Sequence, residues 1–301
     1  MRLIHYRPAV PLDSYVECFW WSRRDTPEST WEHMLPSGNA QMIFALHESP
    51  IVCLPTLSCK APIVWSRGVV HGPQWNYFVS GPKPCGAVAG VSFRPGAAGV
   101  VLGVPITEIT DRHVTINELW GARGPALRER LLQAGAPSAV FRILEQELTE
   151  RLKRPLLIHP AIAYALDPHV NGWVPRRVRD IQRETGYSSR HFIALFRAAV
   201  GLTPKHYFRV KRFTAVLQRL AASNKASLAD IASSVGYSDQ SHLTREFRDF
   251  AGITPTQYRP RGPKSVFHHQ TQDSLRVAPT ASGKKTSRRP QSSELTIDSY
   301  K

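Results

Sequence analysis

The 301-residue chain has few cysteines, and no long apolar stretch interrupts its ordinary mixture of residues. Its four cysteines, Cys18, Cys53, Cys59 and Cys85, form no Cys-x-x-Cys pair, which argues against a structural zinc site and is typical of reduced, mostly buried thiols. No segment approaches the roughly 20 apolar residues of a membrane span. The first 20 residues are broken by charges and prolines, unlike a signal peptide. We therefore expect a cytoplasmic protein without a membrane partner.

Motifs that mark catalytic centres are also missing. The sequence has no Gly-x-Ser-x-Gly elbow, no phosphate-binding glycine-rich loop and no His-Glu-x-x-His helix. Histidines in the first half are scattered singly, and the adjacent His47 and Glu48 would face opposite sides of a strand. We predict that the chain is not an enzyme and that it carries no metal and no cofactor.

Acidic residues are scarce relative to basic ones, with 23 Asp and Glu against 39 Lys and Arg. Residues 1–169 contain 16 basic and 14 acidic side chains, whereas residues 170–262 contain 16 and 6, and residues 263–301 contain 7 and 3. Residues 1–169 are nearly neutral and residues 170–262 are strongly basic, which indicates that the second segment binds a polyanion. Charge alone would fit DNA, RNA or an anionic membrane surface.

The patterning predicts an α+β protein of two domains. Residues 1–108 contain strand-length apolar runs broken by Pro and Gly, which is typical of a β-barrel or sandwich. These runs are Gln41–Leu46, Val69–Val70, Trp75–Val79 and Ala87–Phe93.

The rest of the chain has a different pattern. Residues 109–169 contain two amphipathic segments, Pro125–Gln133 and Pro137–Arg154, and form a helical linker that is a candidate dimerisation region. Residues 170–262 form the basic second domain. Residues 263–301 have few large apolar side chains and are expected to be a disordered basic tail.

One sequence unit occurs twice within residues 170–262. Residues 179–188 match residues 229–238 at an offset of 50, and the residues that follow match at an offset of 51. Twelve identities in one order indicate two copies of one structural unit. The matched pairs are Asp180/Asp230, Ile181/Ile231, Gly186/Gly236, Tyr187/Tyr237, Ser188/Ser238, His191/His242, Phe196/Phe247, Arg197/Arg248, Gly201/Gly252, Thr203/Thr254, Pro204/Pro255 and Tyr207/Tyr258.

Each copy has the signals of a helix-turn-helix. In the second, Ser227 and Asp230 form a capping box that opens a helix, and Gly236 supplies the left-handed residue that ends it. Ser238 is then expected to cap a second helix with polar residues near its N-terminus, as in a recognition helix. An ordinary helical hairpin with a solvated face is the alternative, and the duplication within a basic segment argues against it.

Between the copies, Thr203 and Pro204 start a predicted helix that runs to about Ala222. About 19 residues at roughly 1.5 Å each span about 28 Å. Because successive major-groove faces on one side of DNA repeat about every 34 Å, one chain could hold both recognition helices against adjacent grooves.

These residues resemble the AraC/XylS family of transcription regulators, most clearly in Ile231-Ala232, Gly236–His242 and Thr254-Pro255. The resemblance implies a seven-helix domain that binds double-stranded DNA with both recognition helices in the major groove. The front half is similar to the N-terminal, cupin-like sensory domain of some members, through the segments 35–44 and 93–98.

The family's base-reading positions fall on Gln240, Ser241 and Arg245 in the second copy and on Arg190, Ile193 and Ala194 in the first. Arg can bridge guanine O6 and N7 and Gln can pair with adenine, whereas Ile and Ala offer only contact with a thymine methyl group. Arginines beside these positions are expected to contact phosphates. The predicted DNA-binding residues are Ser189, Arg190, Ile193, Ala194, Arg197, Gln240, Ser241, Thr244, Arg245 and Arg248.

The sequence therefore predicts a sequence-specific DNA-binding transcription regulator, controlled by a small molecule in the N-terminal domain. RNA polymerase and a second copy of the chain are further candidate partners. A non-specific architectural nucleic-acid protein and a cupin-type metalloenzyme fused to a DNA-binding domain are the alternatives. Two local questions stay open: whether Arg94 binds an anionic ligand or ties its loop, and whether helix 137–154 forms a dimer interface or packs on the barrel.

Overall fold

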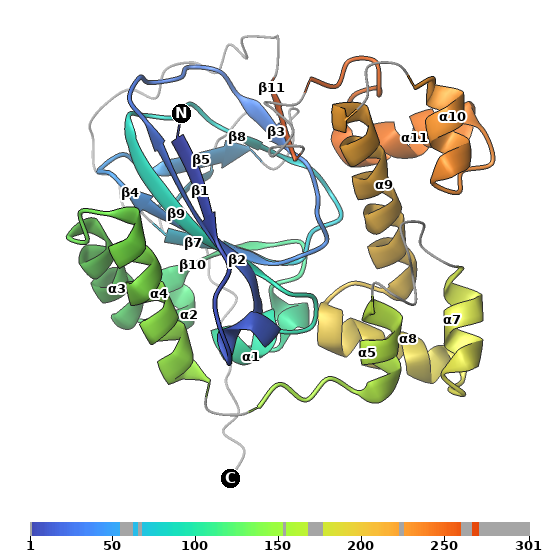
Figure 1. Ribbon diagram of the computed structural model, residues 1–301, viewed down its shortest axis with the longest axis horizontal. Helices are drawn as coiled ribbons and strands as arrows, with labels where there is room; N and C mark the ends of the chain where they lie inside the picture. Colours follow the sequence, from blue (N-terminus) through green and yellow to red (C-terminus); the bar gives the residue numbers. More distant parts are fainter. Residues whose placement is uncertain are drawn as a thin grey trace.

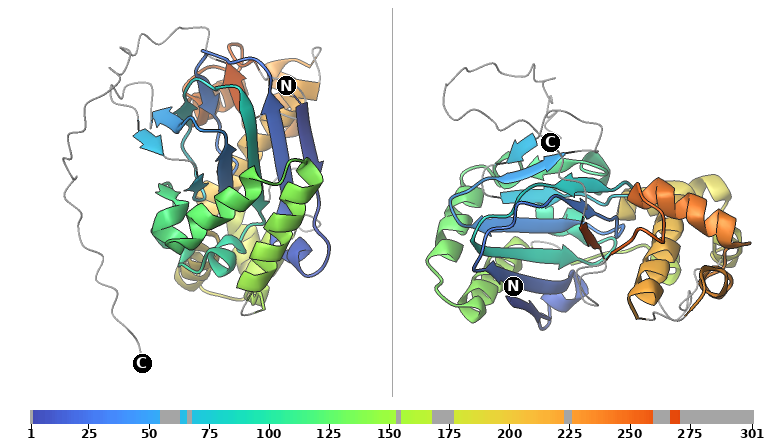
Figure 2. Two further views of the ribbon diagram at one scale, coloured as in Figure 1. Left: turned by 90° about the vertical axis from the view of Figure 1, so that its left-hand side faces the viewer. Right: turned by 90° about the horizontal axis from the view of Figure 1, so that it is seen from above.

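The computed structural model describes residues 2–54, 63–65, 68–152, 155–167, 177–222, 226–259 and 267–270. They form an α+β protein in which a β-barrel with covering helices lies beside a helical domain, as the sequence predicts (Figure 1). Seen from above, the barrel and the helical domain again lie side by side (Figure 2).

The strands form two antiparallel sheets. The six-stranded sheet has the order β1 (Arg2–Tyr6), β2 (Val16–Arg24), β9 (Gly86–Phe93), β4 (Gln41–Leu46), β7 (Gly68–His71) and β10 (His113–Thr115). The five-stranded sheet has the order β11 (His268–Gln270), β3 (Glu32–Met34), β8 (Phe78–Ser80), β5 (Ile51–Leu54) and β6 (Ile63–Trp65).

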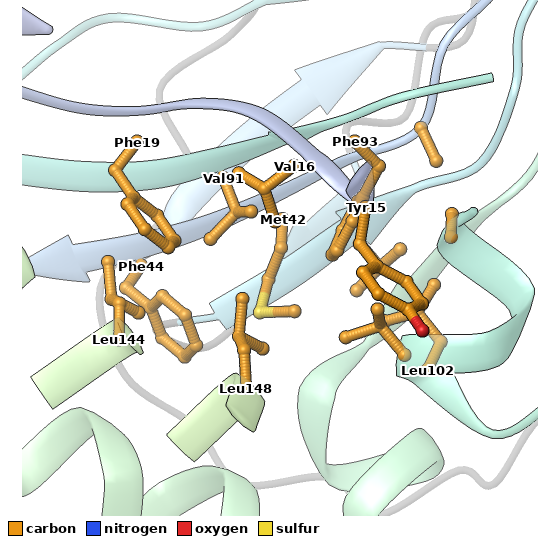
Figure 3. Packing of buried hydrophobic residues seen from close by; sticks show 14 of the residues in the cluster. Tyr15, Val16, Phe19, Met42, Phe44, Val91, Phe93, Leu102, Leu144 and Leu148 are labelled. Atoms are coloured by element: carbon orange, nitrogen blue, oxygen red, sulfur yellow. The ribbon is translucent and has the colours of Figure 1, made fainter. Parts of the chain in front are cut away.

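The two-residue period of the strands separates a packed face from a hollow one. Phe19, Phe44 and Val91 are completely buried and pack against Leu144 and Leu148 of α4 (Pro137–Arg151) (Figure 3). Their neighbours along the strands point to the other face of the sheet and line a cavity. These neighbours include Cys18, Trp20, Ile43 and Ser92. The barrel therefore has one helix-covered wall and an interior that is not filled by its own side chains.

Helix α4 begins at the predicted residue and buries its apolar stripe against the six-stranded sheet. Helices α2 (Ile116–Trp120) and α3 (Arg123–Leu132) lie next to it, and the short α1 (Ala98–Leu102) and the 3-10 turns η1 (Leu12–Ser14) and η2 (Ile106–Glu108) complete the barrel. This geometry favours packing on the barrel for the apolar face of segment 137–154.

Three of the predicted strand segments are confirmed, and one is wrong. Gln41–Leu46 is β4, Val69–Val70 lies in β7, and Ala87–Phe93 lies in β9. Trp75–Val79 was predicted as a strand, but β8 begins only at Phe78 and residues 72–77 are a loop. Trp75 and Tyr77 are half-buried and pack against apolar clusters of the helical domain, whereas Phe78 and Val79 are buried in β8.

The helical domain contains α5 (Pro160–Leu166), α7 (Val178–Glu184), α8 (Ser189–Val200), α9 (Pro204–Ala222), α10 (Leu228–Ser234) and α11 (Gln240–Ala251). Two apolar clusters hold it together, one around α8 and one around α11. Helix α9 contributes to both, with Tyr207 and Phe208 in the first and Phe213 and Leu217 in the second. The predicted connecting helix is confirmed, with all of its 19 residues.

Strand β11 was not expected from the sequence. It lies in the segment interpreted as a tail, and it pairs with β3 so that His269 lies opposite His33. Residues 263–266 and 271–301 of that segment lie outside the described part of the chain, as does Cys59. Within the described ranges, no helix has the length and apolarity needed to cross a bilayer.

Candidate nucleic-acid interface

Each copy of the repeat folds into two helices joined by a turn. In the first unit, Gly186 has φ +74°, and the Ser188 hydroxyl accepts a hydrogen bond from the His191 backbone N–H at 3.3 Å, which caps α8. In the second unit, the Ser227 and Asp230 capping box opens α10 as predicted. These local signals account for the boundaries of both units.

The cap of α11 differs from the prediction. Asp239, not Ser238, is the N-cap, and its Oδ1 accepts from the His242 backbone N–H at 2.7 Å. The second unit has one extra residue in its turn, which is the point at which the repeat offset changes from 50 to 51. The hydrogen bond from His242 N–H lowers the pKa of the Asp239 carboxyl group, so the cap is charged and complements the positive helix N-terminus.

The offset of 51 aligns the two recognition helices residue by residue. Ser189 of α8 corresponds to Gln240 of α11, and Arg190 corresponds to Ser241. One turn later, Ile193 corresponds to Thr244 and Ala194 corresponds to Arg245. Helix α11 thus offers four polar side chains where α8 offers two.

The structure places the predicted contact residues on the outer faces of α8 and α11. Leu243, Phe247 and Phe250 of α11 are buried, whereas the predicted residues of both helices are exposed apart from the half-buried Thr244. The Thr244 hydroxyl donates to the Gln240 carbonyl oxygen of its own helix at 2.9 Å. Ile193 is 43% exposed. The exposed predicted residues are Ser189, Arg190, Ile193, Ala194, Arg197, Gln240, Ser241, Arg245 and Arg248.

Four arginines on these outer faces have no carboxylate partner within the described residues. They are Arg190, Arg197, Arg245 and Arg248. Other arginines of the same domain are engaged: Arg209 and Arg212 both contact Glu246. The unpaired guanidinium groups make the outer faces of both helices positive.

Sequence reasoning missed the buried carboxylate of Glu246. It is 4% exposed and accepts from Arg209 Nε at 2.8 Å and from the Tyr237 hydroxyl at 2.9 Å. Burial and the nearby Glu246 raise the pKa of Tyr237. The signal was present in the spacing, because position 246 follows the buried Leu243 by three residues and so lies on the core face of α11.

A cavity of about 1000 Å³ opens between the barrel interior and α9. Apolar barrel side chains such as Trp20, Ile43 and Phe78 line it, together with Tyr207 and Lys211 of α9. Side chains of both the barrel and the helical domain therefore line this cavity, which we call the shared cavity.

Lys211 ties α9 to the barrel inside this cavity. Its ammonium group donates to the Ser37 carbonyl oxygen and to Asn39 Oδ1, each at 3.1 Å, and burial lowers its pKa to about 8. Arg94 also lines the cavity. Its Nε donates to the Asp13 carbonyl oxygen at 2.6 Å. This hydrogen bond ties the loop that contains Arg94, which is one of the two roles considered for this residue. Among the residues that the structure describes, no group of three or more metal-ligating side chains occurs.

Comparisons with known proteins divide the chain in the same way as the structure. Residues 181–261 match a family described as a helix-turn-helix domain, and residues 4–115 match one described as a domain of unknown function (DUF6597).

Three curated relatives illustrate the similarity. The putative HTH-type transcriptional regulator YkgA of Escherichia coli is 36% identical over 89 residues, covering 29% of this chain and 36% of the relative. The multiple antibiotic resistance protein MarA of Salmonella typhimurium is 29% identical over 85 residues, or 28% of this chain and 66% of the relative. The Msm operon regulatory protein of Streptococcus mutans is 33% identical over 86 residues, or 28% and 30%. The match spans less than two thirds of each of these relatives.

A solved structure of ToxT from Vibrio cholerae aligns with 79% of this chain and 96% of its own, with a TM-score of 0.43 and 12% sequence identity.

Proposed function

We propose that the chain is a sequence-specific DNA-binding transcription regulator of the AraC/XylS type and not an enzyme, since residues 181–261 match a helix-turn-helix family and the relatives that share this segment are transcription regulators. One observation carries the proposal. Two capped helices lie at opposite ends of the 19-residue α9, and each exposes an outer face with unpaired arginines (Figure 1).

The outer face of α11 suits base reading. Gln240 and Arg245 can each form a bidentate pair, with adenine and with guanine respectively, and such a pair discriminates against the wrong base by about 1–3 kcal/mol. In α8 only Arg190 offers a comparable group, while Ile193 and Ala194 can contact a thymine methyl group. We expect the sub-site bound by α11 to show the stricter base preference.

The non-specific architectural alternative makes a different prediction. Binding through charge alone would show little sequence preference and a steep dependence on salt. Selection of bound DNA from a random pool, followed by competition with unselected DNA, separates the two. An enriched sequence that outcompetes unselected DNA by at least about 1000-fold supports the regulator. Enrichment of no sequence would overturn it.

Two variants of α11 sharpen the test. Arg245→Ala should relax preference at one base pair and cost about 1–3 kcal/mol on the selected sequence. Arg248→Ala, a matched loss of an exposed arginine on the same helix, should weaken binding to all sequences alike and reduce the salt slope by about 1. Identical behaviour of the two variants would contradict the role of Arg245.

We also propose that a small molecule controls DNA binding, and the shared cavity supports this proposal. Its volume of about 1000 Å³ lies at the upper end of the range of small-molecule sites, about 300–1000 Å³, and its wall combines apolar side chains with a few polar groups. Because α9 forms part of the wall, an occupant would contact both domains. DNA binding repeated with candidate metabolites tests this part: a change in affinity for the selected DNA supports it.

RNA polymerase and a second copy of the chain are the further partners that the family resemblance implies. Transcription in vitro from a promoter that carries the selected sequence tests the first. The solution mass of the full-length chain, with and without DNA, tests the second. A monomer that has no effect on transcription would remove both from the proposal.

A further inference from the structure

One loop of the barrel contacts both helix-turn-helix units. Residues 72–77 connect β7 to β8 and reach the helical domain at three places. The half-buried Trp75 packs against the apolar clusters of both units. Its indole stacks on His206, in the first turn of α9, with ring centroids 4.3 Å apart and an angle of 9° between the planes.

The loop also contacts the same residue of the repeat in each unit. Gly201 ends α8 and Gly252 ends α11, and the two correspond at the offset of 51. A Cβ atom added at Gly201 would lie 3.2 Å from the ring of Pro73 and 2.5 Å from the Thr110 hydroxyl. A Cβ atom added at Gly252 would lie 2.6 Å from the ring of Tyr77. The two helix ends therefore abut opposite ends of one loop.

Further contacts fix the α11 side of this junction. The ring of Tyr77 stacks on His33 with centroids 4.9 Å apart, and His33 Nδ1 donates to the Ala251 carbonyl oxygen at 2.8 Å. That carbonyl belongs to the last turn of α11, so the hydrogen bond satisfies a group that has no partner within the helix. Burial lowers the pKa of His33, which favours the neutral ring.

The loop is held rigidly at its base. Gly72 N–H donates to the Arg112 carbonyl oxygen at 3.0 Å, and Asn76 Nδ2 donates to Asp111 Oδ2 at 2.8 Å. A Cβ atom at Gly72 would lie 1.7 Å from the Ile109 carbonyl oxygen, so only glycine fits there. Because these contacts fix the loop to the barrel, a displacement of the barrel at this point would also displace the residues of the helical domain that the loop contacts.

From these contacts we infer that residues 72–77 are a spacer that fixes the placement of α8 relative to α11, and so sets the separation of the two DNA sub-sites that one chain reads. Helix α9 sets the distance along its own axis, and the spacer adds a third point of contact that restrains each unit against rotation about α9. The inference rests on the proposed function, because it concerns how two reading helices are held.

The spacer begins and ends at the wall of the shared cavity. His71 precedes it and Phe78 follows it, their rings lie 4.9 Å apart, and both line the cavity. A change in the cavity at these two side chains therefore acts directly on both ends of the spacer.

The test uses the full-length chain and DNA that carries the two selected sub-sites at the selected spacing, or with one base pair inserted or removed between them. One base pair shifts a sub-site by about 3.4 Å and rotates it by about 35°. The wild-type chain should prefer the selected spacing by about tenfold or more. Trp75→Ala should reduce this preference to about twofold or less, and Trp75→Phe, which retains a stacking ring, should restore most of it.

A matched control and a second variant keep the result interpretable. Tyr6→Ala removes an aromatic ring of the barrel that stacks on Phe141 of α4, and it should leave the spacing preference unchanged. His206→Ala removes the other half of the stack; its effect on spacing should match that of Trp75→Ala, and the double variant should add nothing further. Should Trp75→Ala fail to fold, His206→Ala and Trp75→Phe carry the test.

Two results would overturn the spacer. The first is a wild-type chain that binds its selected sequence without any preference for spacing. The second is a folded Trp75→Ala or His206→Ala variant that weakens binding equally at every spacing. Neither result contradicts the proposed function. The proposed function fails if the wild-type chain enriches no sequence from a random pool.

Discussion

Replacement of Glu246 should destabilise the second helix-turn-helix unit without affecting the first. This carboxylate lies on the core face of α11 and joins three elements, because Arg209 and Arg212 come from α9 and Tyr237 from the turn before α11. The corresponding residue of the first unit is Leu195, which suggests Glu246→Leu as the informative change.

The structure sets the size of the expected effect. A hydrogen bond to a charged group contributes about 1.5–3 kcal/mol, and Glu246 accepts from Arg209 Nε at 2.8 Å, from Tyr237 at 2.9 Å and from Arg212 at 3.4 Å. The two arginine side chains are 25% and 24% exposed and regain some water when the carboxylate is removed, which lowers the cost. We expect Glu246→Leu to lose about 3 kcal/mol and Glu246→Gln, which keeps an acceptor for Tyr237, to lose about 1–2 kcal/mol.

Native-state hydrogen exchange measures this loss locally. A loss of about 3 kcal/mol corresponds to exchange on the order of 100-fold faster for amides of α10 and α11, while amides of α8 should not change. Asp249→Asn is the control: Asp249 is 60% exposed and lies 3.6 Å from Arg209, so this ion pair should contribute less than about 1 kcal/mol. Unchanged or slower exchange in Glu246→Leu would refute the reasoning, since it would show that an apolar side chain serves this position equally well.

Three further predictions concern the caps, the glycines and the pH dependence. Asp239→Ala should speed exchange in the first turn of α11, whereas Asp239→Asn, which keeps an acceptor for the His242 N–H, should change it little; equal effects would contradict the cap. Gly252→Ala should lower the thermal midpoint more than Gly186→Ala, because both have positive φ but only Gly252 faces a nearby ring; the reverse order would contradict the contact with the spacer. Burial lowers the pKa of His113 and of His269 to about 4, below the value of about 6.5 expected when unfolded. Their contribution to stability is therefore complete above about pH 6.5 and falls as the pH drops toward 4, by up to about 1.4 kcal/mol per pH unit for each ring. Chemical denaturation at pH 7 and pH 5 tests this, and a stability that does not fall on acidification would contradict it.

The helix-turn-helix units could be predicted because their determinants are local. Ser227 and Asp230 are three residues apart, Gly236 ends the helix they open, and the two copies of the repeat confirm each other's pattern. In the turn before α11, one inserted residue moves the cap from Ser238 to Asp239, and there the prediction is wrong. Local hydrogen bonds decide such boundaries, and a sequence records them directly.

The contacts between the barrel and the helical domain could not be predicted, because their partners lie far apart in the sequence. His33 and Ala251 are 218 residues apart, and nothing near either one indicates the other. The same holds for β11, whose pairing with β3 depends on how the chain returns to the barrel. Trp75 gave a misleading local signal, since an aromatic residue in a short apolar run favours a strand unless it packs across a domain boundary.

The divergence of the two units indicates a division of labour within one DNA-binding domain. The second unit exposes Gln240 and Arg245 and holds the core face of α11 with the buried Glu246, whereas the first exposes Ser189 and Ala194 at the corresponding positions and has the apolar Leu195 in place of Glu246. Specificity requires polar groups held in one geometry, because a bidentate pair is lost when the helix tilts. Apolar contact and charge tolerate such tilting. In the proposed function, the unit that reads bases with Gln240 and Arg245 is therefore also the one whose helix is held by a buried, hydrogen-bonded carboxylate, and the barrel contacts both units at the same glycine of the repeat.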